Sequence, residues 1–423
     1  MTPAPRASAV RLTLIMCIAE TLSMTGFAAY TTLLPRLQRE WLLSNSEAGL
    51  IGGIFFAGYM AAVPVLTSLT DRVDSRRVYA CACLISAFGA AAFALIAGGL
   101  WSALVFQFLI GAGLAGTYMP GLKTLTDHLE GSSQSRGTAF YVACFGVGSS
   151  LSIVACGHIG SGYGWQWAFV FGAIGPVLAA VLVLRAMPLG RVRSEDAQRA
   201  LLDFRPVFKN RMTVAYIVGY CAHNYELFGQ RAWMVAFLVF CASLQPANAP
   251  MLVSAATLAA CINLLGPVMS VTGNELAIRF GRQRVIFTFM TASGIVACFL
   301  GFTASLPWWI VFVFMALHYG LMLGDSAALT AGAVASTPAA QRGSTMAVYS
   351  FIGFTSAFIA PLVFGVVLDV AGGNQSRFAW GLAFASIGVF GVSAPVVRAL
   401  ARDWVERNAS AQARDAVTDA SKT

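Results

Sequence analysis

The chain has 423 residues, of which 58% are hydrophobic and only 11% are charged. A soluble domain carries about a quarter charged residues, so these few charges cannot coat a water-facing surface, and a soluble enzyme is excluded. The net charge of +9 does not indicate nucleic-acid binding, because the basic residues gather in short clusters between apolar runs, as in membrane proteins.

The apolar runs predict an all-α membrane protein with twelve transmembrane helices, since a bilayer core needs about 20 apolar residues per helix. They lie near 11–34, 47–70, 78–98, 101–123, 137–160, 165–187, 212–242, 250–271, 285–304, 308–333, 343–368 and 378–399. The first run continues past Glu20 to Leu34, which indicates a span and not a cleaved signal peptide. The seventh is long, and we expect it to extend past the bilayer or to break near Ser243.

The longest polar stretch between spans divides them into two sets of six. We therefore expect an N-terminal half at 1–188, a central loop at 189–211 and a C-terminal half at 212–402. The loop carries six basic and three acidic residues and is interpreted as an amphipathic linker. The remaining stretch, 403–423, is polar and is expected to be disordered.

The distribution of Lys and Arg predicts how the chain lies in an inner membrane. With the N-terminus in the cytoplasm, only Arg36, Arg39 and Arg377 face outward and Arg231 lies within the seventh span. That leaves 23 of the 27 basic residues on the cytoplasmic side. Because cytoplasmic loops carry the excess of Lys and Arg, we expect both termini and the central loop to be cytoplasmic.

An internal repeat relates the two halves. Arg136-Gly137 opens the fifth span and Arg342-Gly343 opens the eleventh, 206 positions later. Basic turns also follow the second and eighth spans at nearly the same offset: Asp71, Arg72, Arg76 and Arg77 in the first, Arg279 and Arg282 in the second. Two equivalent six-helix bundles related by a pseudo-twofold axis around a central cavity are typical of a transporter.

At these turns the sequence resembles the major facilitator superfamily, and the resemblance covers all twelve spans. The family joins spans two and three by G-x-x-x-D-R-x-G-R-R. Residues 67–77 keep the Asp-Arg pair and the final basic pair, with Thr67 in place of the first glycine and one inserted residue. The second copy, 274–282, keeps Arg-x-Gly-Arg and lacks the Asp, and 164–169 is similar to the family's start of span six.

The resemblance implies that these turns act as a cytoplasmic gate between the halves. The gate residues would be Asp71, Arg72, Arg76, Arg77, Arg136, Arg279, Arg282 and Arg342. Such charges at helix ends can pair with the ends and dipoles of other helices. The alternative is that they only anchor the topology.

Departures from the family pattern bear on the subfamily. Gln107 stands where proton-coupled members usually carry an Arg, and 145–149 lacks the proline of drug/proton antiporters. The chain is similar to organic-anion, cyanate-type and nutrient-uptake members, and no motif fixes the substrate.

Charged side chains within spans are costly, so each requires a function or a partner. Glu20 lies about 13 Å into the first span, near the midplane. In the seventh span, spacing places His223, Glu226 and Gln230 on one face, with Asn224 and Arg231 on an adjacent face. Arg231 therefore points away from Glu226 and faces substrate or another helix. A purely structural role for each group is the alternative.

His318 and Asp325 share one face of the tenth span, and structural and functional roles are equally open for them. The candidate substrate- and proton-binding residues are Glu20, His223, Asn224, Glu226, Gln230, Arg231 and Asp325. The offset of 206 also relates Glu20 to Glu226. We expect these two carboxyl groups to face one cavity, where both cannot ionise cheaply, and to carry a proton.

No catalytic, metal-binding or cofactor motif is present, so we expect no enzyme and no cofactor. The nine cysteines fall in apolar runs and are interpreted as buried small hydrophobes. We predict a monomeric secondary transporter that moves a small polar metabolite by alternating access in proton-coupled uptake. The substrate would be an organic anion, a zwitterion or a vitamin-like nutrient such as riboflavin. An efflux permease for a metabolite or drug, a non-transporting receptor and a channel are the alternatives.

Overall fold

The computed structural model describes residues 6–70, 72–189, 205–248, 250–338, 341–392, 394–396, 398–399 and 402, and the regular elements in these ranges are all helical. The α-helices are α1 (Arg6–Ser23), α2 (Ala29–Glu40), α3 (Asn45–Leu69), α4 (Ser75–Ile96), α5 (Leu100–Thr126), α6 (Gly131–Tyr163), α7 (Trp165–Ala186), α8 (Arg205–Lys209), α9 (Arg211–Ser243), α10 (Ala255–Phe280), α11 (Arg282–Leu300), α12 (Trp308–Gly324), α13 (Ser326–Ala335), α14 (Arg342–Val370) and α15 (Arg377–Gly388). The 3₁₀ turns η2 (Gly301–Ser305) and η4 (Val389–Val392) extend α11 and α15. The predicted all-helical membrane fold is confirmed.

Ten helical segments in the described ranges are long and apolar enough to cross a membrane. The two other predicted spans correspond to the broken α1–α2 pair and to α9, which carries the polar cluster of the seventh span, and neither is among these ten. α9 ends at Ser243, where the sequence indicated a break. Most of the central loop and the stretch 403–423 lie outside the described residues.

The first span is broken where the sequence predicted a continuous helix. Turns at 24–28 separate α1 from α2. Ser152 of α6 bonds to this break, because its Oγ accepts from the Ala28 N–H at 3.0 Å and donates to the Thr25 carbonyl at 2.7 Å. Within a membrane such a break persists only where neighbouring helices satisfy the freed backbone groups, which Ser152 does here.

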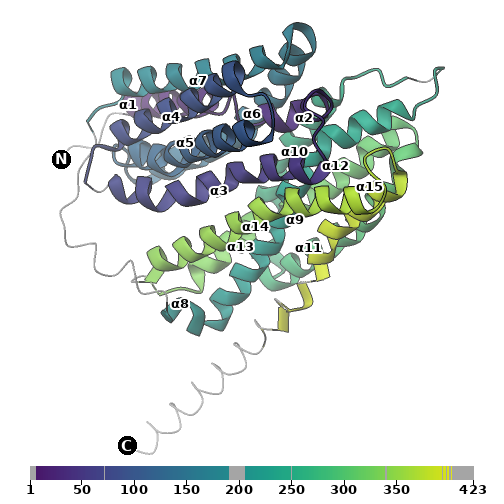
Figure 1. Ribbon diagram of the computed structural model, residues 1–423. Coiled ribbons are helices and arrows are strands. Elements are labelled where there is room, and N and C mark those ends of the chain that lie inside the picture. Colours follow the sequence, from purple (N-terminus) through teal and green to yellow (C-terminus); the bar gives the residue numbers. More distant parts are fainter. Residues whose placement is uncertain are drawn as a thin grey trace, which may run out of the picture.

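The helices form two bundles, α1–α7 and α9–α15, which lie against each other in Figure 1. In the first bundle α4 packs against α5 and α7, and α3 against α5. In the second, α9 packs against α14, α10 against α12 and α11 against α15. The bundles meet mainly along α3 with α14 and α6 with α10.

The turns between helices lie at two opposite ends of the molecule. The end with the α3–α4 and α10–α11 turns is called the basic end, and the end with the α2–α3 and α14–α15 turns is called the far end. Near the far end the bundles touch closely: a Cβ on Gly49 or Gly53 of α3 would collide with the carbonyl of Pro361 or Phe358 on α14. Toward the basic end α3 is uncovered, and Val65 is 65% exposed. The bundles are therefore closed at the far end and separated at the basic end.

Asp369 joins the two bundles at the far end. Its carboxylate accepts hydrogen bonds from the backbone N–H groups of Asn45 and Ser46 at 3.0 and 2.8 Å. The side chains of the same two residues also donate to it, at 2.8 Å from Asn45 and 2.6 Å from Ser46. Asp369 of α14 thus caps the N-terminus of α3, a helix of the opposite bundle, where a negative charge is favoured.

Candidate functional site

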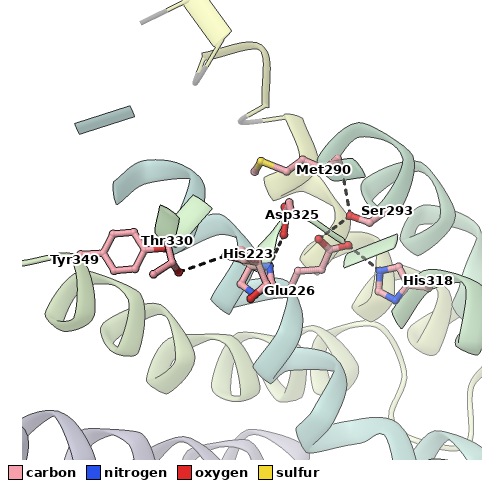
Figure 2. A network of polar contacts seen from close by, with 9 residues as sticks. His223, Glu226, Met290, Ser293, His318, Asp325, Thr330 and Tyr349 are labelled. Atoms are coloured by element: carbon pink, nitrogen blue, oxygen red, sulfur yellow. Dashed lines mark hydrogen bonds and ion pairs between the residues drawn. The ribbon is translucent and has the colours of Figure 1, made fainter. Parts of the chain in front are cut away.

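Two histidine–carboxylate pairs lie buried inside the C-terminal bundle (Figure 2). His223 Nδ1 is 2.7 Å from Asp325 Oδ1, and His318 Nε2 is 2.7 Å from Glu226 Oε1. Ser293 of α11 donates a further hydrogen bond to Glu226 Oε2 at 2.9 Å. All four side chains are at most 4% exposed. The pairs keep titratable groups in the membrane region without an uncompensated charge.

The pairs form because α9 and α12 each contribute one acid and one histidine. His223 and Glu226 lie one turn apart on α9, and His318 lies two turns before Asp325 at the end of α12. The acid of each helix faces the histidine of the other. A histidine and a carboxyl group in contact can share one proton and pass it between them.

Arg231, two turns after His223 on α9, lies at the interface of the two bundles. Its Nε and Nη2 donate to the hydroxyl oxygen of Tyr319 at 3.0 and 2.6 Å. Beside it is a small cavity of about 40 Å³. The lining residues come from both bundles: Phe27, Tyr30, Thr31, Gly52, Phe55, Phe56, Gln107, Phe228, Arg231 and Ala232.

The guanidinium of Arg231 has aromatic neighbours and no acidic partner. It lies 5.9, 5.7 and 5.7 Å from the ring centroids of Phe145, Phe228 and Tyr319. Among the residues that the structure describes, no carboxylate lies within ion-pairing distance of it. A cation in such surroundings favours an anionic ligand.

A hydrogen-bonded chain connects Arg231 to the N-terminal bundle. Tyr319 donates to Asn263 Oδ1 of α10 at 2.7 Å. The Asn263 amide donates to the hydroxyl oxygens of Ser149 and Ser150 of α6, at 2.6 and 2.8 Å. The orientation of the guanidinium is therefore tied to the contact between α6 and α10.

Glu20 does not share a cavity with Glu226, and that expectation was wrong. Tyr141 of α6 donates to Glu20 Oε2 at 2.8 Å, and Ser23 lies 3.4 Å from the same oxygen. Each glutamate points into its own bundle and not toward the interface, so neither lines the cavity. The repulsion expected between two neighbouring carboxylates therefore does not arise.

Asn224 and Gln230 are also buried in the C-terminal bundle, away from the cavity lining. Within the described residues, neither the nitrogen nor the oxygen of the Gln230 side-chain amide has a hydrogen-bonding partner. The same holds for Asn224 Nδ2. Of the seven candidate residues, only Arg231 lines the cavity, while His223, Glu226 and Asp325 join the buried pairs.

The expected gate residues gather at the basic end. Arg76 bonds to Asp74, with Nη2 2.7 Å from Oδ2, and to the Met187 carbonyl, both within its own bundle. The exposed gate residues are Arg72, Arg77, Arg136 and Arg279, and Arg282 is half-buried. In the described part of the chain no hydrogen bond or ion pair links these side chains across the bundles, which are separated at this end. Asp71 and the side chain of Arg342 lie outside the described residues.

Several members of the site carried no clear signal in the sequence. Tyr319, Asn263, Ser293 and Tyr141 are isolated polar residues in apolar helices, a pattern that packing residues also give. The sequence left both a structural and a functional role open for His318, and its contact with Glu226 is visible only in the structure. In the described ranges no three His, Cys, Asp or Glu side chains gather in a way that could hold a metal ion.

The family model described as Major Facilitator Superfamily matches residues 16–274, more than half of the chain. The chain belongs to the Major Facilitator Superfamily. It is therefore a multi-pass membrane protein, and the family expected from the motifs is confirmed. The match includes the first basic turn, the broken first span and the helix that carries His223, Glu226 and Arg231.

Two relatives within this superfamily are distant in sequence. The niacin transporter NiaP of Acinetobacter baylyi is 24% identical over 39% of this chain and 36% of its own length. The sialic acid transporter NanX of Escherichia coli is 24% identical over 42% of this chain and 43% of its own length. The chain thus spans less than half the length of these curated relatives.

A solved structure shares the fold over most of the chain. The crystal structure of a bacterial homolog to the human lysosomal transporter Spinster, in an inward-facing and unoccupied conformation, has a TM-score of 0.75. It is 16% identical and covers 95% of this chain and 99% of its own. At this identity the likeness concerns the fold alone.

Proposed function

We propose that this member of the superfamily is a secondary transporter that takes up a small organic anion across an inner membrane, coupled to protons. The observation that carries the proposal is Arg231, a cation in a cavity between the two bundles for which the described residues offer no acidic partner. A cation without a counter-ion at this position is costly unless a ligand supplies the charge. The alternative roles of efflux permease and non-transporting receptor lack a comparable observation.

We infer alternating access from the difference between the two ends of the molecule. The positive-inside rule places the basic end in the cytoplasm, so we propose that this conformation opens toward the cytoplasm. In the opposite conformation the far end opens and the basic end closes. Asp71 and Arg72 would then come together with the opposite bundle and act as the proposed gate.

Proton coupling is proposed to reside in the Glu226–His318 pair. His318 and Tyr319 are consecutive residues of α12: one contacts Glu226 and the other holds Arg231. An anion bound to Arg231 competes with the Tyr319 hydroxyl for the same N–H groups. A resulting shift of α12 changes the contact between His318 and Glu226, which links substrate binding to proton exchange.

The relatives support an anionic substrate. NiaP is named for niacin and NanX for sialic acid, and both compounds are carboxylic acids. A carboxylate is the group that a guanidinium binds with two parallel hydrogen bonds. In Arg231, Nε and Nη2 share one hydroxyl oxygen, and a carboxylate would give each donor its own acceptor.

The test uses purified protein in liposomes with an imposed pH gradient. Labelled benzoate, nicotinate, lactate, succinate and N-acetylneuraminate are offered in turn, and counterflow is measured for any that accumulate. We expect Glu226→Gln to abolish pH-driven accumulation while substrate exchange continues, and Arg231→Ala to abolish binding. Glu130→Gln, which changes an exposed carboxylate outside both sites, is the matched control.

Two results would contradict the proposal. pH-driven accumulation that persists unchanged in Glu226→Gln removes the proton role of the pair. Failure of all five anions to bind or cross the membrane, in a protein shown to be folded, removes the anion transporter. Binding without counterflow would favour the receptor.

A further inference from the structure

The aromatic residues around the cavity form a closed circuit that begins and ends at Arg231. From the guanidinium the circuit passes to Phe228 at 5.7 Å, then to Phe56 with ring centroids 4.2 Å apart. Phe56 contacts Phe55 at 5.1 Å, which contacts Phe27 at 5.6 Å. Phe27 contacts Phe145 at 5.3 Å, and Phe145 lies 5.9 Å from the guanidinium.

Both bundles supply this circuit. Phe228 and Arg231 come from α9, while Phe27 lies at the break between α1 and α2, and Phe55 and Phe56 lie on α3. The cavity therefore has one cationic corner, and most of the remaining lining is ring surface.

We propose that the transported anion is a planar aromatic monocarboxylate, whose carboxylate binds Arg231 and whose ring lies among the phenylalanines. This inference rests on the proposed transport function and names its substrate class. Aromatic rings prefer offset-stacked and edge-to-face contacts, and the rings already present in the circuit favour such contacts with a further ring.

The charge of the lining limits the ligand to one negative group. Arg231 is the one charged residue among the ten lining residues, all of which lie in described ranges. A second carboxylate on the substrate would face phenyl rings without a partner, and burying an unpaired charge is costly. A neutral amide of the same shape would leave the guanidinium without its counter-ion.

The remaining polar groups narrow the class further. The cavity volume in this conformation is about 40 Å³, below the range of about 300–1,000 Å³ for ligand pockets, so a ring enters only when the two bundles move apart at the cavity. Thr31 and Gln107 are the uncharged polar side chains of the lining, apart from Tyr30, whose hydroxyl already donates to the Ala48 carbonyl at 2.9 Å. They suit one ring nitrogen or hydroxyl group, and a polyhydroxylated sugar acid would leave most of its hydroxyl groups facing rings.

The test measures binding to the purified full-length protein by calorimetry. We expect benzoate and nicotinate to bind, and cyclohexanecarboxylate, which keeps the charge and loses the flat ring, to bind about ten-fold more weakly. Benzamide, phthalate and N-acetylneuraminate are expected to bind at least a hundred-fold more weakly or not at all. Phe228→Leu and Phe56→Leu should each reduce the preference for benzoate over cyclohexanecarboxylate, whereas Phe88→Leu, at an exposed position on α4, should not.

The outcomes separate this inference from the proposed function. Equal affinity for benzoate and cyclohexanecarboxylate, or a preference unchanged in both leucine variants, overturns the aromatic class. If lactate, succinate or N-acetylneuraminate accumulates with the pH gradient and benzoate and nicotinate do not, the anion transporter stands and the aromatic inference is wrong. If no anion binds, both are wrong.

Discussion

Removing the Asp369 carboxylate should open the far end of the molecule. In Asp369→Ala the four hydrogen bonds to Asn45 and Ser46, at 2.6–3.0 Å, disappear together. All four join α14 of one bundle to the N-terminus of α3 in the other. The change therefore destabilises the conformation that is closed at the far end, and leaves the opposite conformation unaffected.

The size of the effect follows from the nature of these bonds. Hydrogen bonds to a charged group contribute about 1.5–3 kcal/mol to stability. Asp369 is exposed, and water screens much of that contribution, so about 2 kcal/mol for the whole group is a reasonable magnitude. A difference of 1.4 kcal/mol is tenfold in an equilibrium constant, so the conformational equilibrium should shift by about thirty-fold.

Hydrogen–deuterium exchange with mass spectrometry measures this shift in the intact protein. Faster exchange is expected both at the start of α3 and in the last turns of α14, by up to about thirty-fold where global closure protects them. Glu47→Gln is the matched control, because Glu47 caps α3 within its own bundle through Ser44 at 2.8 Å. Faster exchange in Glu47→Gln should be confined to the start of α3. Unchanged exchange at the end of α14 in Asp369→Ala would refute the role of this contact.

Three further substitutions probe the site and the interface. Tyr319→Phe removes the hydroxyl that orients the guanidinium and should weaken carboxylate binding about ten-fold in calorimetry, whereas the loss of a mere packing residue would leave affinity unchanged. Gly53→Ala puts a Cβ against the Phe358 carbonyl and should loosen the contact between the bundles, so cysteines introduced at the far end should be alkylated faster. An unchanged alkylation rate would contradict the tight contact. His318→Ala leaves Glu226 buried with the Ser293 hydroxyl but without its histidine, and should cost about 3–5 kcal/mol, seen as a lower Tm. Adding Glu226→Gln should recover part of that loss, and no recovery would argue against the pair.

Much of the fold could be predicted from the sequence because membrane spans depend on composition. A bilayer requires long apolar helices, so the boundaries of α3, α7 and α9 fall within a few residues of the expected ranges. The break at 24–28 could not be predicted, because no proline marks it. It depends on Ser152, a residue far away in the chain whose hydroxyl replaces the missing backbone hydrogen bonds.

The charged members of the site were predictable from the sequence, but their pairings were not. Helical periodicity shows which residues share a face of α9, so the cluster around His223 and Glu226 was visible. Periodicity does not show which helix lies opposite that face, and the two carboxylates could equally have met substrate or solvent. Arg231 was the exception, because its spacing from Glu226 already indicated that it faces substrate or another helix.

The two glutamates related by the repeat have acquired different surroundings, and this difference suggests how the halves divide their work. Glu20 of α1 contacts the hydroxyl groups of Tyr141 and Ser23, and among the described residues no basic side chain pairs with it. Glu226 of α9 contacts His318, which can take up the proton that Glu226 releases. A hydroxyl partner holds a carboxyl group in place, whereas a histidine partner can exchange a proton with it. Because Arg231 also lies on α9, under the proposed function one helix would connect the cavity with the Glu226–His318 pair, and the N-terminal half supplies most of the aromatic residues around that cavity.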